Sequence, residues 1–272
     1  AAKELPALRA ATADLSWLLS HGYAEQSALK LVGDRHELTV RQRQAVSRCA
    51  CSDAARDRRL ARRITRDEFL ARDPPTLAID GFNCLITIES ALSHGIVLRG
   101  RDGALRDLAS VHGTYRQVAE TAFAVEMLGR HLHGPREAQP PAPRTDTHTP
   151  PDPPPLAVTW FLDRPVANSG RLRALLLEIA ERRGWPWTCE LVNNPDAVLI
   201  RPEHPVVASS DAFILEHCAR WFDPLGSLLA AGSPSASAAH VPTSGPVLAA
   251  RPGLWLLDLG SPSPSSSGIG ET

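Results

Sequence analysis

Three aspartates stand where apolar, strand-like segments of the sequence end. Asp80 closes one segment, Asp163 closes a second, and Asp211 follows a third. Helical patterns separate these segments, which predicts right-handed crossovers and a mostly parallel sheet. Because the carboxyl ends of parallel strands share one edge, where ligands bind in open α/β sheets, we expect the three carboxylates to line one crevice.

Converging carboxylates favour a particular chemistry. They repel one another, and the repulsion raises their pKa values unless a cation neutralises it. Mg²⁺ and Mn²⁺ prefer oxygen ligands of this type, and a pair of such ions activates water and stabilises the leaving oxygen in phosphodiester cleavage. The alternative is that each aspartate only caps a helix, since Asp is a common N-cap. Asp211 is open to both interpretations, because Ser209-Ser210-Asp211 is also a good helix start.

The apolar patterns also predict the elements that position the aspartates. Residues 1–73 are expected to form a small all-helical, Arg-rich module, with a helix-turn-helix pattern around Gly33 and a capping box from Thr39 to Gln42. Residues 74–225 are expected to form an α/β domain, with strands at residues 76–80, 156–163, 187–192 and 205–209 and helices at residues 117–131 and 169–183.

Other segments carry turn and low-complexity signals. Residues 134–155 hold nine prolines in 22 residues, which indicates an extended, solvated insertion. Residues 226–272 are expected to be a low-complexity, disordered tail, interrupted by an apolar island at residues 254–258. Gly100-Arg-Asp-Gly103 predicts a hairpin turn. Asn168-Ser169-Gly170 begins a helix whose free N–H groups suit a phosphate, although plain capping by Ser169 is the favoured interpretation.

The acidic segments resemble a known group of proteins. Asp80-Gly81-Phe82-Asn83 is similar to the Asp-x-x-Asn opening of the NYN branch of PIN-like domains. Phe161-Leu-Asp163 resembles their middle acidic strand end, and Val207-Ala-Ser-Ser-Asp211-Ala-Phe-Ile214 resembles their late strand-to-helix element. The sequence from Leu15 to about Asp223 is also similar to an uncharacterised prokaryotic family, domain of unknown function 434 with a PIN-like C-terminal half. That likeness is carried by residues 31–35, 38–43, 79–90, 112–115 and 163–170.

The resemblance implies a PIN-like, three-layer α/β fold and a set of site residues. Asp80, Asp163 and Asp211 would be the catalytic metal ligands, with Asn83 orienting Asp80 or a phosphate and Ser210 supporting Asp211. Further candidates are weaker: Asp196 and Glu89 as metal ligands, Asp107 and His112 as supporting residues, and Arg116 on phosphate or paired with an acid.

The N-terminal module is locally basic although the whole chain has a net charge of −1. From Arg35 to Arg66 there are ten Arg against three acids. Arginine binds phosphates through its planar fork, so this region is expected to contact nucleic acid in a salt-sensitive way. The alternative is an ordinary solvated, charged helix face. The arginines expected to contact nucleic acid are Arg41, Arg43, Arg48, Arg56, Arg58, Arg59 and Arg62.

Composition limits the function classes. The sequence has no apolar run of membrane-spanning length and no signal-peptide pattern at its start, and its five cysteines suit free thiols in a reducing cytoplasm. Cys49-x-Cys51 has no second pair that would complete a zinc site. We expect a metal-dependent PIN-like nuclease that uses Mg or Mn and acts on RNA more than DNA. The alternative is a non-catalytic nucleic-acid-binding or regulatory protein that retains the fold. A phosphatase is disfavoured, because Asp80 does not begin an Asp-x-Asp pattern. Whether the chain forms a homodimer is left open by the sequence.

Overall fold

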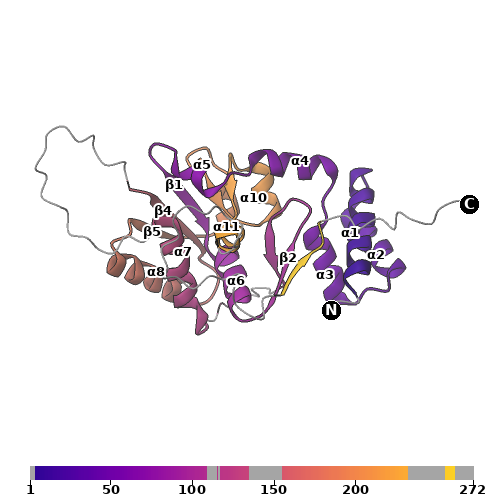
Figure 1. Ribbon diagram of the computed structural model, residues 1–272, viewed down its shortest axis with the longest axis horizontal. Helices are drawn as coiled ribbons and strands as arrows, with labels where there is room; N and C mark the ends of the chain where they lie inside the picture. The colour runs from indigo at the N-terminus through magenta and orange to yellow at the C-terminus, as the bar shows by residue number, and fades with distance from the viewer. Residues whose placement is uncertain (1–3, 109–114, 116, 135–154, 232–254, 261–272) are drawn as a thin grey trace, which may run out of the picture. The chain divides into compact units, whose positions relative to one another are not determined.

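The computed structural model describes residues 4–108, 115, 117–134, 155–231 and 255–260 (Figure 1). The chain divides into two compact units. We name the first the helical unit; it holds Ala1–Ala61, Gly95–Leu108 and Leu254–Thr272. The second, the sheet unit, holds Arg62–His94 and Ala109–Gly253. The helical unit thus includes two segments that the sequence patterns had grouped with the α/β domain and the tail.

Four helices build the N-terminal module, as expected: α1 (Leu5–Ser20), α2 (Glu25–Arg35), α3 (Val40–Cys49) and α4 (Asp53–Arg62). The predicted capping box at the start of α3 is confirmed, since Thr39 and Gln42 accept hydrogen bonds from each other's backbone N–H groups. Ser52 caps α4 by accepting a hydrogen bond from the Ala55 N–H at 3.2 Å. Leucine, alanine and valine side chains from α1, α2 and α3 form the core of this module.

A small sheet completes the helical unit, in the order β3–β2–β8: β2 (Ile96–Arg99), β3 (Leu105–Asp107) and β8 (Trp255–Asp258). β2 and β3 are antiparallel, and the Gly100 N–H donates to the Ala104 carbonyl at 3.1 Å, which confirms the predicted hairpin turn. β8 pairs in parallel with β2. The apolar island of the expected tail is therefore a strand within this unit.

The sheet unit is built on five parallel strands in the order β5–β4–β1–β6–β7. They are β1 (Thr76–Asp80), β4 (Ala157–Asp163), β5 (Trp187–Val192), β6 (Val207–Ala208) and β7 (Trp221–Phe222). The four predicted strands are confirmed, and β7 is an additional one. Side chains of β1, β4 and β7, among them Ile79, Trp160 and Trp221, are fully buried, as parallel strands covered on both faces require.

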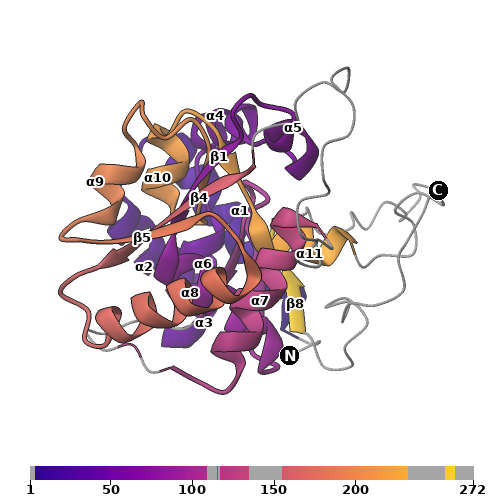
Figure 2. The ribbon, with the colours of Figure 1, turned by 90° about the vertical axis from the view of Figure 1, so that its left-hand side faces the viewer.

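Helices α6 (Gly81–Leu92), α7 (Glu120–His133) and α8 (Ser169–Arg183) pack side by side next to this sheet (Figure 2). α8 has the predicted bounds, and α7 begins and ends slightly later than expected. The short helices of the unit are α5 (Arg66–Leu70), α9 (Pro195–Leu199), α10 (Ala212–His217) and α11 (Pro224–Ala231). Most of α11, residues 226–231, lies in the range expected to be disordered. Residues 135–154, most of the predicted proline-rich insertion, lie outside the described residues.

Two predictions from composition can be compared with the structure. All five cysteines are buried and form no disulfide. Across the described residues, none of the helices combines the length and the apolar character needed to span a membrane.

Candidate active site at the carboxyl edge of the parallel sheet

The strand order places the aspartates at the point where the direction of the sheet reverses. From β1 the chain continues to β4 and β5 on one side, and then returns to β6 on the other side of β1. Ligands of open α/β sheets bind at the carboxyl ends of the two strands that flank such a reversal. Here those ends carry Asp80, the last residue of β1, and Asp211, which follows β6. Asp163 ends β4, the neighbour of β1.

Asp80 is the most deeply buried of these acids, with a relative exposure of 7%. Burial raises its pKa from 3.8 to about 7, a hydrogen bond from Ser209 opposes the rise, and the charges of Asp211, Asp196 and Asp163 add to it. The Ser209 hydroxyl donates to Asp80 Oδ2 at 2.8 Å. The four aspartates are therefore close enough to act on one another electrostatically.

The pKa values of Asp163 and Asp196 are raised as well, although Asp163 is half-buried and Asp196 is exposed. Desolvation raises the pKa of Asp163. Partial desolvation also raises the pKa of Asp196, and Asp211 and Asp163 raise it further by charge repulsion. Asp196 lies in the first turn of α9, the helix that follows β5. Asp196 thus belongs to the same edge of the sheet as Asp80, Asp163 and Asp211.

Gly81 explains how Asp80 fits at the end of β1. A Cβ atom at position 81 would lie 2.9 Å from the Phe161 carbonyl oxygen and 2.4 Å from Leu162 Cδ2. Only glycine therefore permits the helix that follows Asp80 to start this close to β4. The Asp-Gly-Phe-Asn segment thus combines a chemical group with the small residue that positions it.

Two serines and an asparagine fix the loop between β6 and α10. The Ser210 N–H and hydroxyl donate to Asn83 Oδ1 at 2.8 and 2.9 Å. The Ser209 hydroxyl, besides donating to Asp80, accepts the Asp211 N–H at 3.0 Å. Ser209 thus links the two acidic loops, whereas Ser210 is held by Asn83. The pattern Ser209-Ser210-Asp211 pointed to this loop, but a sequence cannot tell which serine faces the acids.

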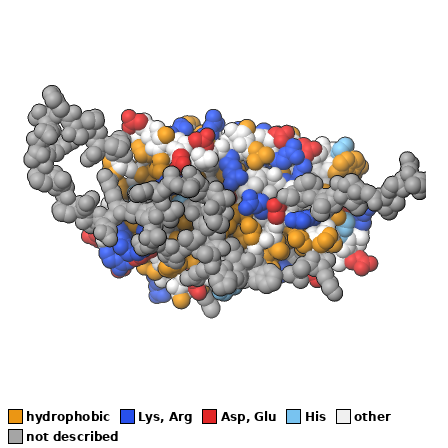
Figure 3. Space-filling view, in the orientation of Figure 1, with side chains coloured by type: hydrophobic (Ala, Val, Ile, Leu, Met, Phe, Trp, Pro, Cys, Tyr) orange, Lys and Arg blue, Asp and Glu red, His pale blue; other side chains and the backbone are white. Residues whose placement is uncertain are grey.

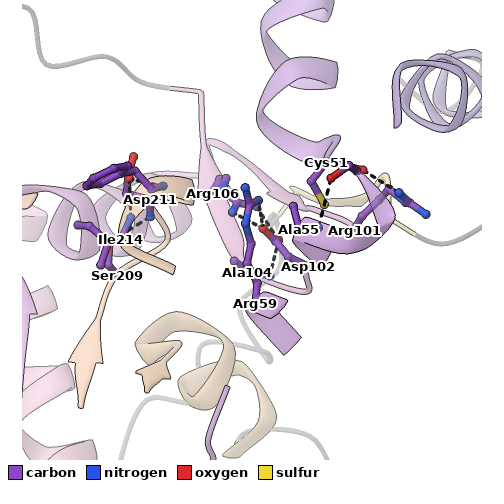
Figure 4. Close-up of polar contacts among 12 residues, drawn as sticks. Cys51, Ala55, Arg59, Arg101, Asp102, Ala104, Arg106, Ser209, Asp211 and Ile214 are labelled. Carbon is purple, nitrogen blue, oxygen red and sulfur yellow. Dashed lines mark hydrogen bonds and ion pairs between the residues drawn. The ribbon is translucent and has the colours of Figure 1, made fainter. Parts of the chain in front are cut away.

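Asp211 has the capping role that the sequence left open. Its Oδ1 accepts the N–H groups of Phe213 at 2.8 Å and Ile214 at 3.2 Å (Figure 4). Capping occupies one carboxylate oxygen and does not prevent the other from binding a ligand. Phe213, in the first turn of α10, is 48% exposed and its ring lies against His217, with ring centroids 4.4 Å apart. An exposed aromatic ring therefore adjoins the acidic loop.

The donor atoms at this edge fit a hard divalent cation, since all are carboxylate oxygens. In the part of the chain that the structure describes, however, no three His, Cys, Asp or Glu residues are grouped closely enough to hold one metal ion. Mg²⁺ commonly binds through one or two carboxylates and keeps several waters. Pairs of these aspartates therefore suit such an ion, and Asp80 and Asp211 are the pair at the strand reversal.

Two family models match the chain. The model described as Domain of unknown function (DUF5616) matches residues 73–139 and 153–227, and the model described as Protein of unknown function (DUF434) matches residues 7–62. The chain belongs to the DUF5616 family. The DUF5616 match contains all four aspartates of the edge, and its interruption falls within the predicted proline-rich insertion. The likeness to domain 434 is thus limited to the N-terminal helices.

One curated relative extends this likeness. An uncharacterised protein of Methanocaldococcus jannaschii is 28% identical over 205 residues, which cover 75% of this chain and 86% of the relative. No solved structure matches the chain significantly. Neither the two family descriptions nor the name of the relative states a function.

Within the DUF5616 region, Glu89 has a different setting from the aspartates. Its buried Oε1 accepts hydrogen bonds from the Tyr115 hydroxyl and, at 2.6 Å, from the Thr121 hydroxyl. At 1.5 Å of rise per residue, Glu89 lies about 12 Å along α6 from Gly81. The structure therefore places it away from the Asp80 end of the helix, where it holds residue 115 and the start of α7.

The remaining supporting residues fall elsewhere or outside the described residues. Asp107 belongs to the helical unit, where its carbonyl accepts a hydrogen bond from Arg48 at 2.7 Å. His112 and Arg116 lie outside the described residues.

The arginines of the N-terminal module are largely engaged with acids and carbonyls of the protein. Arg59 is buried, and its Nη1 lies 2.8 Å from Asp102, which also binds Arg106 (Figure 4). Burial removes Arg59 from the set that is able to reach a phosphate. Arg41 is exposed. Three of the other predicted arginines form ion pairs: Arg43 with Asp34, Arg48 with Asp107, and Arg56 with Asp53 and Asp57. Arg58 is exposed and Arg62 is half-buried.

Basic and acidic side chains are interspersed on the face seen in Figure 3. A surface of mixed sign produces a weaker field for steering an anion than a surface of one sign. On this face, a contact of the module with nucleic acid would therefore come from individual exposed arginines.

Proposed function

We propose that this protein is a metal-dependent nuclease that acts on RNA. The observation that carries the proposal is the set of four aspartates at the carboxyl edge of the parallel sheet, whose charges act on one another although one of them is buried. Sites that shift pKa values by burial and like charge are candidates for catalysis, and a buried carboxylate among acids is stabilised by a bound cation. The resemblance of the Asp80–Asn83 and Val207–Ile214 segments to PIN-like domains supports the same reaction class.

In this proposal Mg²⁺ or Mn²⁺ would be held by pairs of the aspartates Asp80, Asp163, Asp196 and Asp211, with Asp80 and Asp211 as the pair at the strand reversal, and would supply an activated water and neutralise charge on the leaving oxygen. Ser209 orients Asp80 and the loop before Asp211, and Asn83 fixes that loop through Ser210. Gly81 keeps the backbone of the Asp80 loop close to β4. The exposed ring of Phe213 offers a stacking surface for an unpaired base, which favours a single-stranded substrate.

A second candidate is a nucleic-acid-binding or regulatory protein of the same fold without catalysis. The absence of a group of three metal-ligating residues among those described favours it. It retains the exposed arginines of the helical unit and Phe213 of the sheet unit as separate contacts for nucleic acid and needs no bound ion.

The test compares cleavage of a labelled single-stranded RNA with that of DNA of the same sequence, with Mg²⁺, with Mn²⁺ and with EDTA. We expect RNA cleavage only with metal, and loss of at least a hundredfold of the rate in Asp80→Asn. The matched control is Asp67→Asn, because the Asp67 side chain is 92% exposed on α5. Equal cleavage by all three proteins would come from a contaminant and would reject the site. Salt-sensitive RNA binding without cleavage in either metal would support the second candidate.

A further inference from the structure

The end of α1 carries an exposed aromatic surface in the helical unit. Trp17 has a relative exposure of 57%, whereas the other tryptophans whose burial the structure describes are at most 8% exposed. The His21 ring stacks on the Trp17 ring, with centroids 3.9 Å apart and an angle of 28° between the planes. We name Trp17 and His21 the α1 ring pair. Tyr23, two residues further on, is 55% exposed. Large aromatic rings gain most when a partner covers them, so this surface is a candidate for ligand binding.

A hydrogen bond fixes the orientation of the α1 ring pair. His21 Nδ1 donates to the Trp17 carbonyl at 2.8 Å, which holds the two rings against each other. Any residue at position 17 offers that carbonyl, so stabilising the end of α1 does not require an exposed indole there. Phe213 and His217 repeat the arrangement on α10 of the sheet unit, where His217 Nδ1 donates to the Phe213 carbonyl at 2.8 Å. The chain thus builds the same exposed pair beside the acidic loop, where stacking on a base is already proposed.

Guanidinium groups lie beside the α1 ring pair. Ser20 Oγ accepts the Asp53 N–H at 2.9 Å, which joins the end of α1 to the start of α4. Asp53 in turn pairs with Arg101 at 2.7 Å and with Arg56 at 3.5 Å. Arg101 lowers the pKa of Asp53 by hydrogen bonding and by charge, and Arg56 and His21 lower it further. Two guanidinium groups and the His21 ring therefore gather around one carboxylate.

This combination matches a nucleic-acid strand with unpaired bases. Bases stack on aromatic rings, and guanidinium groups bind the phosphates between them. α4 contains four arginines and two aspartates, so the helix next to the α1 ring pair is basic. Exposed ion pairs such as that of Arg56 with Asp53 are weak, and a phosphate competes with them.

The surroundings of Trp17 fit a base better than a protein. A stable protein interface buries about 800 Å² on each partner and has an apolar centre. On α1, the positions one turn from Trp17 besides His21 hold Ala13, Asp14 and Ser20, which are small or polar. The apolar area around the indole is therefore about the size of a single ring.

We propose that the α1 ring pair and Arg56 bind single-stranded nucleic acid, with Trp17 stacking on an unpaired base and Arg56 contacting a neighbouring phosphate. That the strand is RNA rests on the proposed function, whereas stacking on a base does not. In this assignment the helical unit holds the strand through its bases as well as through its phosphates. It should therefore prefer single strands to duplexes, in which the base faces are covered.

The first experiment measures binding of a fluorescein-labelled single-stranded RNA to the full-length chain in EDTA, by anisotropy. Trp17→Ala should weaken the affinity about tenfold, the effect of losing one stacked base. The matched control is Leu31→Ala, since Leu31 on α2 of the same unit is 59% exposed, and it should leave the affinity unchanged. Arg56→Gln should weaken binding and reduce its salt dependence. Duplex RNA of the same sequence should bind equally to the original chain and to Trp17→Ala.

Thermal melting of each variant shows that the fold is kept. Equal affinities of the original chain and Trp17→Ala for single-stranded RNA overturn the proposal. So does a loss of the same size in Leu31→Ala, or a loss in Trp17→Ala that is as large for duplex RNA. A salt dependence that is unchanged in Arg56→Gln overturns the phosphate contact.

The second experiment uses the indole itself as the probe. A base that stacks on Trp17 should quench the tryptophan fluorescence of the original chain when RNA binds. Trp17→Phe retains a ring for stacking and removes this indole, so it should lose the quenching and bind RNA more tightly than Trp17→Ala. Quenching of equal size in the original chain and Trp17→Phe overturns the position of the base. Sedimentation that shows a dimer of the original chain but not of Trp17→Ala assigns the ring to a contact between copies and also overturns the proposal.

Failure of this proposal and failure of the proposed function are distinguishable, because binding is measured without metal. Binding that depends on Trp17, together with no cleavage in Mg²⁺ or Mn²⁺, would refute the nuclease activity and leave the α1 surface standing. Metal-dependent cleavage by a Trp17→Ala chain that binds RNA as tightly as the original overturns the α1 surface and leaves the nuclease standing.

Discussion

Asp80→Asn should make the protein more stable at neutral pH, and the gain should depend on pH in a defined way. The pKa of Asp80 rises from 3.8 to about 7 because the carboxyl group is buried among other acids. A tenfold change in proton affinity is worth about 1.4 kcal/mol, so ionisation of Asp80 costs the folded state about 4 kcal/mol relative to the unfolded state. Asparagine does not ionise, and its amide oxygen still accepts the Ser209 hydrogen bond.

The sign follows from the direction of the shift. Below pH 4 the carboxyl group is protonated in both states and Asp80 contributes no penalty. As pH rises from about 4 to about 7, the unfolded chain releases the proton and the folded chain keeps it, so the free energy of unfolding falls by about 1.4 kcal/mol per pH unit. Asp80→Asn removes this loss. The difference in stability between the two proteins should therefore grow over that range and then stay constant.

Urea unfolding at a series of pH values, followed by tryptophan fluorescence, measures this difference. Asp67→Asn serves as the control with an exposed acid and should follow the original chain. Adding Mg²⁺ at pH 8 should stabilise the original chain and leave Asp80→Asn nearly unchanged. Stability curves of the original chain and Asp80→Asn that run parallel from pH 4 to pH 8 would refute the assigned environment of Asp80.

Three further predictions each concern a single contact. Gly81→Ala should lower the free energy of unfolding by about 1–3 kcal/mol, measured by urea unfolding, because the new methyl group meets the Phe161 carbonyl and Leu162; unchanged stability would contradict the close approach. Arg59→Ala should destabilise the chain by about 3 kcal/mol in thermal melting, since it breaks a buried ion pair. Arg41→Ala should keep the stability and weaken RNA binding in a filter-binding assay. Loss of stability in Arg41→Ala, with loss of RNA binding alone in Arg59→Ala, would contradict the buried position of Arg59. Phe213→Ala should reduce the affinity for single-stranded RNA about tenfold and Phe213→Trp should restore it, because stacking on a base is worth about 1–3 kcal/mol; equal affinities would exclude stacking.

The sheet and its acidic edge could be predicted because their signals are local. Each of β1 and β4 is an apolar run with an acid at its end, and alternation with helices fixes the strands as parallel. The hydrogen bonds that tie Asp80 to Ser209 and Ser210 to Asn83 join residues more than a hundred positions apart. Such pairings depend on strand order and register, which the sequence pattern does not specify.

The position of Arg59 shows the same limit in the helical module. On α4 the arginine-rich pattern predicts a charged face, and a charged face is normally exposed. The partner that makes burial possible, Asp102, lies in the β2–β3 hairpin far along the chain. β8 is a similar case, since a short apolar island does not identify β2 as the strand that it pairs with.

Asp80 and Asp102, two of the buried aspartates, show the difference between a structural acid and a candidate functional one. Asp102 is buried, which raises its pKa, but Arg106 and Arg59 more than offset this and hold the pKa at about 2. Asp80 is buried as well, and its charged neighbours are Asp211, Asp196 and Asp163. A fold that needed only a stable core would pair Asp80 with a cation of its own, as it does for Asp102. A cation bound at the edge of the parallel sheet would compensate the repulsion that remains there, and this makes the four aspartates, more than any arginine of the N-terminal module, the feature from which a function should be sought.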